Sequence, residues 1–283
     1  MLELISRGRT LWFLALLGAG GCKSEAPAPT PAPPPAPAAS PAPVAKGTLV
    51  VFAAASLRDA FGSLKTEFGK THPNLDVSFN FAGTQELRAQ LEHGAAVDVF
   101  ASADRKNMNE LEGASRVTKP AVFARNEPVI VVAKEHASAV SGLADLPKLD
   151  KLVIGVPDVP IGRYTAQILS NANKTLGADF SSKFEKKVVS RELDVRQVLA
   201  KVTLGEADAG IVYRTDANTA QGKVGIVSIP ADMNVIAEYP IAVVAAAPHP
   251  APAGEWVKFV LSPAGQELLG KAGFIAPAAA GGS

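Results

Sequence analysis

The sequence predicts an α/β fold of two lobes, in which mixed, mostly parallel sheets are flanked by helices. From Thr48 onward, short apolar runs alternate with helical patterns. The apolar runs are almost continuously hydrophobic, which is typical of strands covered on both faces. The chain has 283 residues, 47% of them hydrophobic. That length is sufficient for two lobes that each bury a core.

The individual elements follow from the spacing of apolar residues. The stretch TLVVFA predicts a strand. Apolar residues then recur at helical spacing over 57–70 and predict a helix there. Further strands are expected at 77–82, 97–103, 128–133, 151–156, 209–213 and 239–247. Further helices are expected around 84–93, 105–111, 163–176, 195–204, 255–261 and 265–271.

The first 22 residues have the pattern of a secretory signal peptide. Arg7 and Arg9 precede an apolar run over 11–17, and small residues lead to Cys22. Cys22 is the only cysteine and stands where a bacterial lipoprotein signal is cleaved and lipidated. The alternative is a plain cleaved signal that removes Cys22. Without a second cysteine, the mature domain has no internal disulfide.

A Pro/Ala-rich linker over 23–47 follows the signal, and a short flexible tail over 278–283 ends the chain. The linker composition favours extended polyproline II and cannot form a core. It therefore acts as a spacer between an anchor and a folded domain.

Charge and composition exclude several functions. The formal net charge is +1 and aromatic residues make up 6%, which gives no basis for binding nucleic acid or an acidic membrane through a basic surface. The four histidines show no metal-ligand spacing, and no glycine-rich loop of the GxxxxGK[ST] type is present. The sequence therefore predicts no metal site, no cofactor and no ATPase activity.

Four strand-to-helix junctions carry residues suited to anion binding, because free N–H groups of helix N-termini lie outside the carboxyl ends of strands. They are AAASL with Ser56, FAGTQEL with Thr84, PDVPIGRY with Pro160, Ile161 and Gly162 before a helix, and ELDVRQVL, where Asp194-Val195 opens one. Taken singly, Ser56 and Thr84 are better explained as helix caps, since SLRD fits the capping-box pattern. Convergence of several junctions on one point would distinguish a ligand site from separate caps.

Six motifs in order give the chain a family resemblance: VFAAASLRDAF, DVFASAD, VPIGRY, DVRQVL, GIVYxxDA and YPIAVV. Together they resemble the periplasmic molybdate-binding proteins of ABC importers, over almost all of 48–277. The resemblance implies a two-lobed periplasmic-binding-protein fold, with a hinge made by two crossovers. Lobe I would comprise 48–126 plus 240–277, and lobe II 127–239.

In that family a tetrahedral oxyanion is held between the lobes by uncharged donors. By position, Ser56 and Thr84 would donate through hydroxyl and backbone N–H groups, Ile161 and Val195 through backbone N–H groups, and Tyr213 through its phenol. The resemblance implies no catalytic residue, a metal that enters only as the oxyanion, and a monomer that delivers its ligand to a membrane permease. Thr84 replaces a serine and Ile161 an alanine, so the choice among molybdate, tungstate and sulfate stays open.

A site made only of donors selects fully ionised anions, because a proton on the ligand would be buried against other donors. Together with this selectivity, the resemblance implies a periplasmic or cell-surface protein, anchored by a lipid on Cys22, that binds molybdate or tungstate. Sulfate is the alternative ligand, and a serine-dependent hydrolase or a structural lipoprotein is the alternative class. Ser56 lacks the GxSxG context of a hydrolase nucleophile. We expect Asp98 and Asp104 to have structural roles, and Arg58, Arg163 and Arg196 to be solvated.

Overall fold

The computed structural model describes residues 47–278. Residues Pro43–Ser283 form one compact unit. The expected signal peptide with Cys22, the linker up to 46 and the tail after 278 lie outside the described residues. Within residues 47–278, no helix is both long and apolar enough to span a bilayer.

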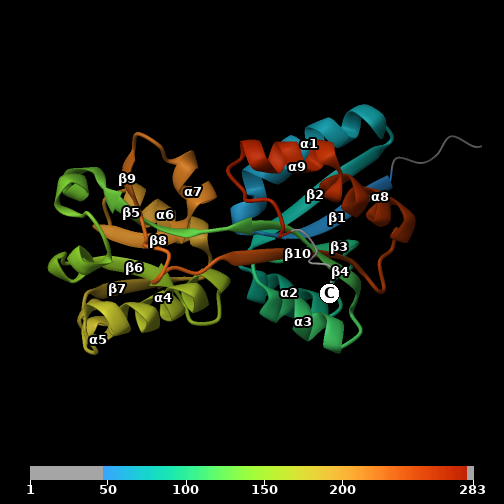
Figure 1. Ribbon diagram of the computed structural model, residues 1–283. Coiled ribbons are helices and arrows are strands. Elements are labelled where there is room, and N and C mark those ends of the chain that lie inside the picture. Colours follow the sequence, from blue (N-terminus) through green and yellow to red (C-terminus); the bar gives the residue numbers. More distant parts are fainter. Residues whose placement is uncertain (1–46, 279–283) are drawn as a thin grey trace, which may run out of the picture. The chain divides into compact units, whose positions relative to one another are not determined.

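The first lobe is built on a five-stranded sheet in the order β2-β1-β3-β10-β4. Helices cover both of its faces, with α1, α8 and α9 on one side and α2 and α3 on the other (Figure 1). The strands are β1 (Gly47–Ala54), β2 (Leu75–Ala82), β3 (Val99–Ala101), β4 (Val117–Asn126) and β10 (Ala237–Val244). The helices are α1 (Arg58–Thr71), α2 (Thr84–Glu92), α3 (Arg105–Gly113), α8 (Pro250–Leu261) and α9 (Pro263–Lys271), and the short 3₁₀ helix η1 (Ala55–Leu57) precedes α1.

The second lobe is built on another five-stranded sheet, in the order β7-β6-β8-β5-β9. Helix α6 packs against its three central strands, and α4 packs on β6 and β8. The strands are β5 (Pro128–Ala133), β6 (Leu152–Gly155), β7 (Val188–Glu192), β8 (Ala209–Tyr213) and β9 (Val224–Ser228). The helices are α4 (Pro160–Leu176), α5 (Phe180–Glu185), α6 (Val195–Thr203) and α7 (Arg214–Thr219), with 3₁₀ helices η2 (Lys134–Ala139) and η3 (Leu143–Lys148).

The two sheets are mixed, as predicted, but the parallel pairs do not predominate. In the first sheet β1 is parallel to β2 and β3, whereas β10 is antiparallel to β3 and β4. The second sheet repeats this division, with β6 parallel to β7 and β8, and β5 antiparallel to β8 and β9. The antiparallel pairs involve the strands at the two crossings between the sheets. The chain passes from β4, which ends at Asn126, to β5, which begins at Pro128. It returns from β9, which ends at Ser228, to β10, which begins at Ala237.

The carboxyl ends of the parallel strands carry the loops of interest. In the first lobe β1 and β2 run in the same direction, so Ala54 and Ala82 lie opposite each other at the end where η1 and α2 begin. The core behind this edge is aromatic: Phe61 and Phe68 of α1 each contact Trp256 of α8 edge-on, and all three are fully buried. Because this core fixes α1, α8 and the sheet together, it holds the loop ends rigidly in place.

Candidate functional site

One cavity lies where helices from both lobes begin. It is lined by residues at the starts of η1, α2, α4 and α6 and at the end of β8, and its volume is about 20 Å³. Pockets for drug-sized ligands measure roughly 300–1,000 Å³, so this cavity suits an ion of a few atoms. All five residues proposed from the sequence are among those that line it: Ser56, Thr84, Ile161, Val195 and Tyr213.

The first lobe contributes two buried hydroxyl groups. Ser56 lies in η1 and Thr84 is the first residue of α2, and they are 3% and 1% exposed. The Ser56 hydroxyl is hydrogen-bonded to the Tyr239 hydroxyl at 3.0 Å. The Thr84 hydroxyl accepts from the backbone N–H of Ala103 at 3.2 Å. Thr84 therefore keeps its own proton to donate.

The prediction that these two hydroxyls cap helices is wrong. The N-cap positions of η1 and α2 are held by Ala54 and Gly83, and neither helix has a side-chain cap. Ser56 and Thr84 follow those positions and are already helical, so their side chains do not reach back to the free N–H groups. Those N–H groups stay available at the cavity.

The second lobe contributes backbone N–H groups. Ile161 follows Pro160, the first residue of α4, and Val195 is the first residue of α6. The N–H groups of a first helical turn have no acceptor within the helix. None of the backbone hydrogen bonds found outside regular elements in residues 47–278 uses the N–H of Ser56, Thr84, Ile161 or Val195. The sequence placed Ile161 just before its helix; it lies instead within the first turn, where its N–H is free.

Asp194 is the one carboxylate that lines the cavity. It is the N-cap of α6, and its Oδ1 accepts from the N–H groups of Arg196 and Gln197 at 2.7 and 3.0 Å. The Gln197 side-chain amide donates to its Oδ2 at 2.9 Å. The charge of Asp194 is thus taken up by the helix it caps, and Val195 N–H remains for a ligand.

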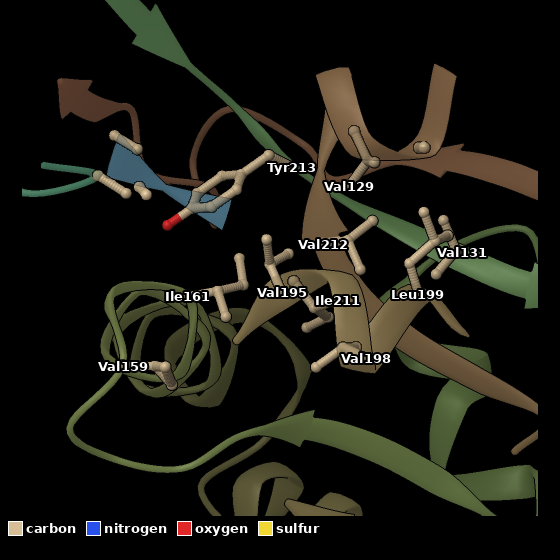
Figure 2. Close-up of a cluster of buried hydrophobic side chains, with 14 of the residues drawn as sticks. Val129, Val131, Val159, Ile161, Val195, Val198, Leu199, Ile211, Val212 and Tyr213 are labelled. Carbon is tan, nitrogen blue, oxygen red and sulfur yellow. The ribbon is translucent and has the colours of Figure 1, made fainter. Parts of the chain in front are cut away.

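Tyr213 lines the cavity with a phenol that has no hydrogen-bond partner among residues 47–278. Its side chain is 1% exposed, and its hydroxyl finds no hydrogen-bond acceptor or donor in the described part of the chain. Figure 2 shows this oxygen pointing away from Val129 and Val212 of the second sheet, with Ile161 and Val195 beneath the ring. Burial raises the pKa of Tyr213 well above its usual value, so the phenol stays protonated. An unpaired buried hydroxyl costs free energy unless a ligand accepts its proton.

Four contacts join the two lobes around this cavity, and we call them the cross-lobe contacts. The Gln85 side-chain amide donates to the Leu193 carbonyl at 3.0 Å, and the Tyr164 hydroxyl donates to the Ala103 carbonyl at 3.4 Å. Arg163 of α4 forms an ion pair with Asp104, and Arg196 of α6 with Asp59 of α1. Residues next to the cavity lining therefore bridge the two lobes.

The expectation that Arg163 and Arg196 are solvated is wrong. Their side chains are 21% and 23% exposed, and Arg196 also forms an ion pair with the fully buried Asp216. Arg58 is exposed, as expected, and lies 4.8 Å over the Phe81 ring. The carboxylate partners come from elements far away in the sequence, so position at a helix start did not identify them.

Asp98 and Asp104 hold loops of the first lobe, in agreement with the structural role expected for them. Asp98 accepts from the backbone N–H groups of Val50 and His249 at 2.8 and 2.7 Å. Asp104 is the N-cap of α3 and accepts from the N–H of Asn107 at 2.9 Å. Asp104 also receives Arg163, so it links a loop of the first lobe to the second.

Two residues of the site were missed by the sequence analysis. Gly83 lies so close to the Leu193 carbonyl that a β-carbon added there would approach it well inside 3.0 Å. Tyr239 supports Ser56 from β10, at a register shift between Tyr239 and Pro240. A proline within a predicted central strand signals such an irregularity, and irregular strands near sites redirect side chains. That signal was present in YPIAVV.

Comparison with known proteins agrees with this geometry. The chain matches the family described as bacterial extracellular solute-binding protein over residues 49–275. The chain belongs to this family. It is 39% identical over 233 residues to the molybdate-binding protein ModA of Mycobacterium tuberculosis, an alignment that covers 81% of this chain and 85% of that protein. It is 34% identical over 209 residues to ModA of Escherichia coli, covering 70% of this chain and 78% of that protein.

The fold is also that of a solved relative. The periplasmic molybdate-binding protein of Azotobacter vinelandii superimposes with a TM-score of 0.70, covering 81% of this chain and 99% of that one, at 20% sequence identity. The two-lobed periplasmic-binding-protein fold predicted from the sequence is thus confirmed. As a member of the family, this solute-binding protein works outside the cytoplasm.

Proposed function

We propose that this solute-binding protein captures molybdate in the cavity between its lobes and delivers it to the permease of an ABC importer. The observation that carries the proposal is the unpaired phenol of Tyr213, buried beside helix-start N–H groups from both lobes. The N–H groups can only donate, the protonated phenol has its proton to donate, and a fully ionised tetrahedral oxyanion can only accept. Relatives named molybdate-binding protein ModA, at up to 39% identity, support molybdate as the ligand.

The helix N-termini explain how a dianion is held without a counter-charge. Helices α2, α4 and α6 begin at the cavity, and each N-terminus carries a partial positive charge worth about 0.3–1 kcal/mol toward an anion, or more when partly buried. A hydrogen bond to a charged acceptor contributes about 1.5–3 kcal/mol. The arginines of the rim are paired with carboxylates and hold the lobes together.

We place the two lobes at 48–126 plus 240–277 and at 127–239, and the hinge at the two connections between the sheets. The cross-lobe contacts form only when the lobes are together, so bound anion and lobe closure stabilise each other. The closed form would present a surface of both lobes to the permease. Tungstate is a second expected ligand because it matches molybdate in shape and charge.

Isothermal titration of the compact unit from Pro43 onward tests the proposal. The titrants are molybdate, tungstate, sulfate and phosphate at pH 7.5. We expect one-to-one binding of molybdate and tungstate, weaker binding of sulfate, and the weakest binding of phosphate, which carries a proton at this pH. If sulfate bound most tightly, the transported anion would be sulfate and its binding by uncharged donors would still hold. If no anion bound, the proposal would be refuted.

Tyr213→Phe is expected to weaken molybdate binding by about tenfold, since one hydrogen bond to a charged acceptor is lost. The fold should persist, because the hydroxyl has no partner within the described residues. Val195→Ala is the matched control: its proposed contact is a backbone N–H, so its affinity should stay within a few-fold of the wild type. Equal affinities for Tyr213→Phe and the wild type would remove the phenol from the site.

We propose that Cys22 carries a lipid anchor and that the residues over 23–47 form a spacer to the folded unit. Cys22→Ser is therefore expected to move the protein from the membrane fraction to the soluble extracytoplasmic fraction. Fractionation followed by detection of the protein in both pools measures this. Membrane association of the variant equal to that of the wild type would favour a cleaved signal with another means of retention.

The hydrolase alternative receives no support at Ser56. The hydrogen-bond partner of the Ser56 hydroxyl is a tyrosine, and burial raises the pKa of Tyr239 well above its usual value. A neutral buried phenol does not accept a proton as a general base near neutral pH. Ser56 is therefore better explained as an anion donor than as a nucleophile.

A further inference from the structure

Tyr239 is a buried residue outside the ligand cavity that contacts one of the proposed ligand donors. It lies on β10, is fully buried, and its ring packs edge-on against Tyr213, at 5.7 Å between ring centroids, and against Phe274, at 5.4 Å. Its hydroxyl is hydrogen-bonded to Ser56 Oγ at 3.0 Å, across 183 positions of sequence. The shift of strand register at Tyr239 and Pro240 is the local irregularity that accompanies this orientation.

Either hydroxyl of this pair can donate, and the two arrangements differ at the cavity. If Ser56 donates to Tyr239, only lone pairs of Ser56 face the ligand, and the phenol proton of Tyr239 must find an acceptor other than Ser56. If Tyr239 donates to Ser56, the proton of Ser56 is free to point into the cavity. The second arrangement satisfies both hydroxyls once an anion is bound, and a buried donor left unpaired is costly.

Thr84 shows the same arrangement on the neighbouring helix. Its hydroxyl oxygen accepts from the Ala103 backbone N–H at 3.2 Å, a group that can only donate. Both hydroxyls that the first lobe contributes to the cavity thus have a buried group behind them that can donate. A hydroxyl can either donate or accept. When a neighbouring group donates to its oxygen, its own proton is left to donate to a ligand.

We propose that Tyr239 is a specificity-determining positioning residue, which makes Ser56 a donor and thereby rejects tetrahedral oxyanions that carry a proton. This inference rests on the proposed function and deepens it. A protonated anion such as hydrogen phosphate needs an acceptor for its own proton. With Tyr239 donating to Ser56, turning the Ser56 hydroxyl to accept that proton leaves its own hydrogen without a partner. Fully ionised anions such as molybdate meet no such conflict.

Tyr239→Phe removes the orienting donor and keeps the ring. Ser56 can then turn to accept from a protonated anion or to donate to an ionised one. We expect molybdate affinity to fall by about 10-fold and phosphate affinity to rise. The dissociation constant for phosphate divided by that for molybdate should therefore decrease by more than about 10-fold. Tyr164→Phe is the matched control. Its hydroxyl bonds a backbone carbonyl across the lobes, so its loss should affect all anions alike and leave the ratio unchanged.

The experiment is a double-mutant cycle with Ser56→Ala, Tyr239→Phe and both together, with molybdate and phosphate titrated calorimetrically into each protein. Melting temperatures report whether each variant folds. Because Tyr239 acts through Ser56, the double variant should match Ser56→Ala, with no further loss. Additive effects, or a folded Tyr239→Phe with the wild-type ratio, would overturn the inference.

Ser56→Ala keeps the inference testable if Tyr239→Phe does not fold. A strictly donating Ser56 penalises phosphate, so Ser56→Ala should weaken molybdate more than phosphate and narrow the ratio. Equal losses for both anions would mean that Ser56 turns freely, and Tyr239 would have no role in selection. Absence of binding by the wild type to any of the four anions would refute the proposed function itself, whereas wild-type selectivity retained in a folded Tyr239→Phe refutes only this inference.

Discussion

Gly83→Ala is expected to weaken molybdate binding by about 5- to 150-fold, the range that corresponds to the ~1–3 kcal/mol cost of overpacking a tight contact. A β-carbon at Gly83 would meet the Leu193 carbonyl well inside 3.0 Å. That carbonyl belongs to the other lobe and is backbone, so it cannot rotate away. A β-carbon would also come within 3.0 Å of the Gln85 side chain, which belongs to the same lobe and can turn away. The clash with Leu193 exists only when the lobes are together, and the substitution therefore disfavours the closed, ligand-bound form.

The stability of the separate lobes should change little in this variant. Gly83 has φ −59° and ψ 136°, which alanine adopts without strain. Gly62→Ala is the matched control, because nothing lies within 4 Å of a β-carbon there. Calorimetric titration measures affinity, and small-angle scattering with and without molybdate measures closure. Gly83→Ala binding as tightly as Gly62→Ala, with the same contraction, would show that the lobes do not need this close approach.

The fold class and the four junctions at the cavity could be predicted because both follow from local patterns, whereas Tyr213 and the role of each residue came from the family resemblance. Strand–helix alternation predicts the sheets, and parallel strands bring their carboxyl ends to one edge. The junctions with Ser56 and Thr84 lie on adjacent strands of one sheet, and those with Ile161 and Val195 on the other. A single junction could not show whether its hydroxyl caps a helix or donates to a ligand. The convergence of the junctions on one cavity favours ligand donors.

The rest of the site depends on pairs that are distant in the sequence. Ser56 and Tyr239 are 183 positions apart, and Arg196 and Asp59 are 137 apart. No local pattern encodes such a pair, so the arginines were expected to be solvated. Gly83 has a negative φ, so no special backbone conformation marks it, and its importance lies in the approach of Leu193 from the other lobe. Steric demands of this kind appear only when both lobes are placed.

Arg196→Met is expected to lower the free energy of unfolding by about 3–5 kcal/mol, the usual cost of removing one partner of a buried ion pair. Asp216 is fully buried, and apart from Arg196 its carboxylate oxygens find no hydrogen-bond partner within residues 47–278. Asp59→Asn is the matched control. Asp59 is 58% exposed, and exposed ion pairs contribute about 0–1 kcal/mol, so this variant should lose little stability.

The pH dependence of the loss identifies its cause. Burial raises the pKa of Asp216 to about 7 despite the opposing effect of Arg196, and removing Arg196 raises it further. Between pH 3.8 and its pKa in the folded protein, Asp216 is protonated in the folded state and ionised in the unfolded state. The free energy of unfolding therefore falls as the pH rises up to and through the pKa of folded Asp216. The two proteins therefore differ most above pH 7, where wild-type Asp216 is ionised.

At pH 5 Asp216 is protonated in both proteins, and removing Arg196 no longer leaves a buried charge. Urea unfolding at pH 8 and pH 5 should therefore show a large deficit for Arg196→Met at the higher pH and a smaller one at the lower. Equal deficits at both values would mean that Arg196 stabilises the protein by packing rather than by charge. A deficit as large in Asp59→Asn would shift the stabilising role from Asp216 to the cross-lobe pair.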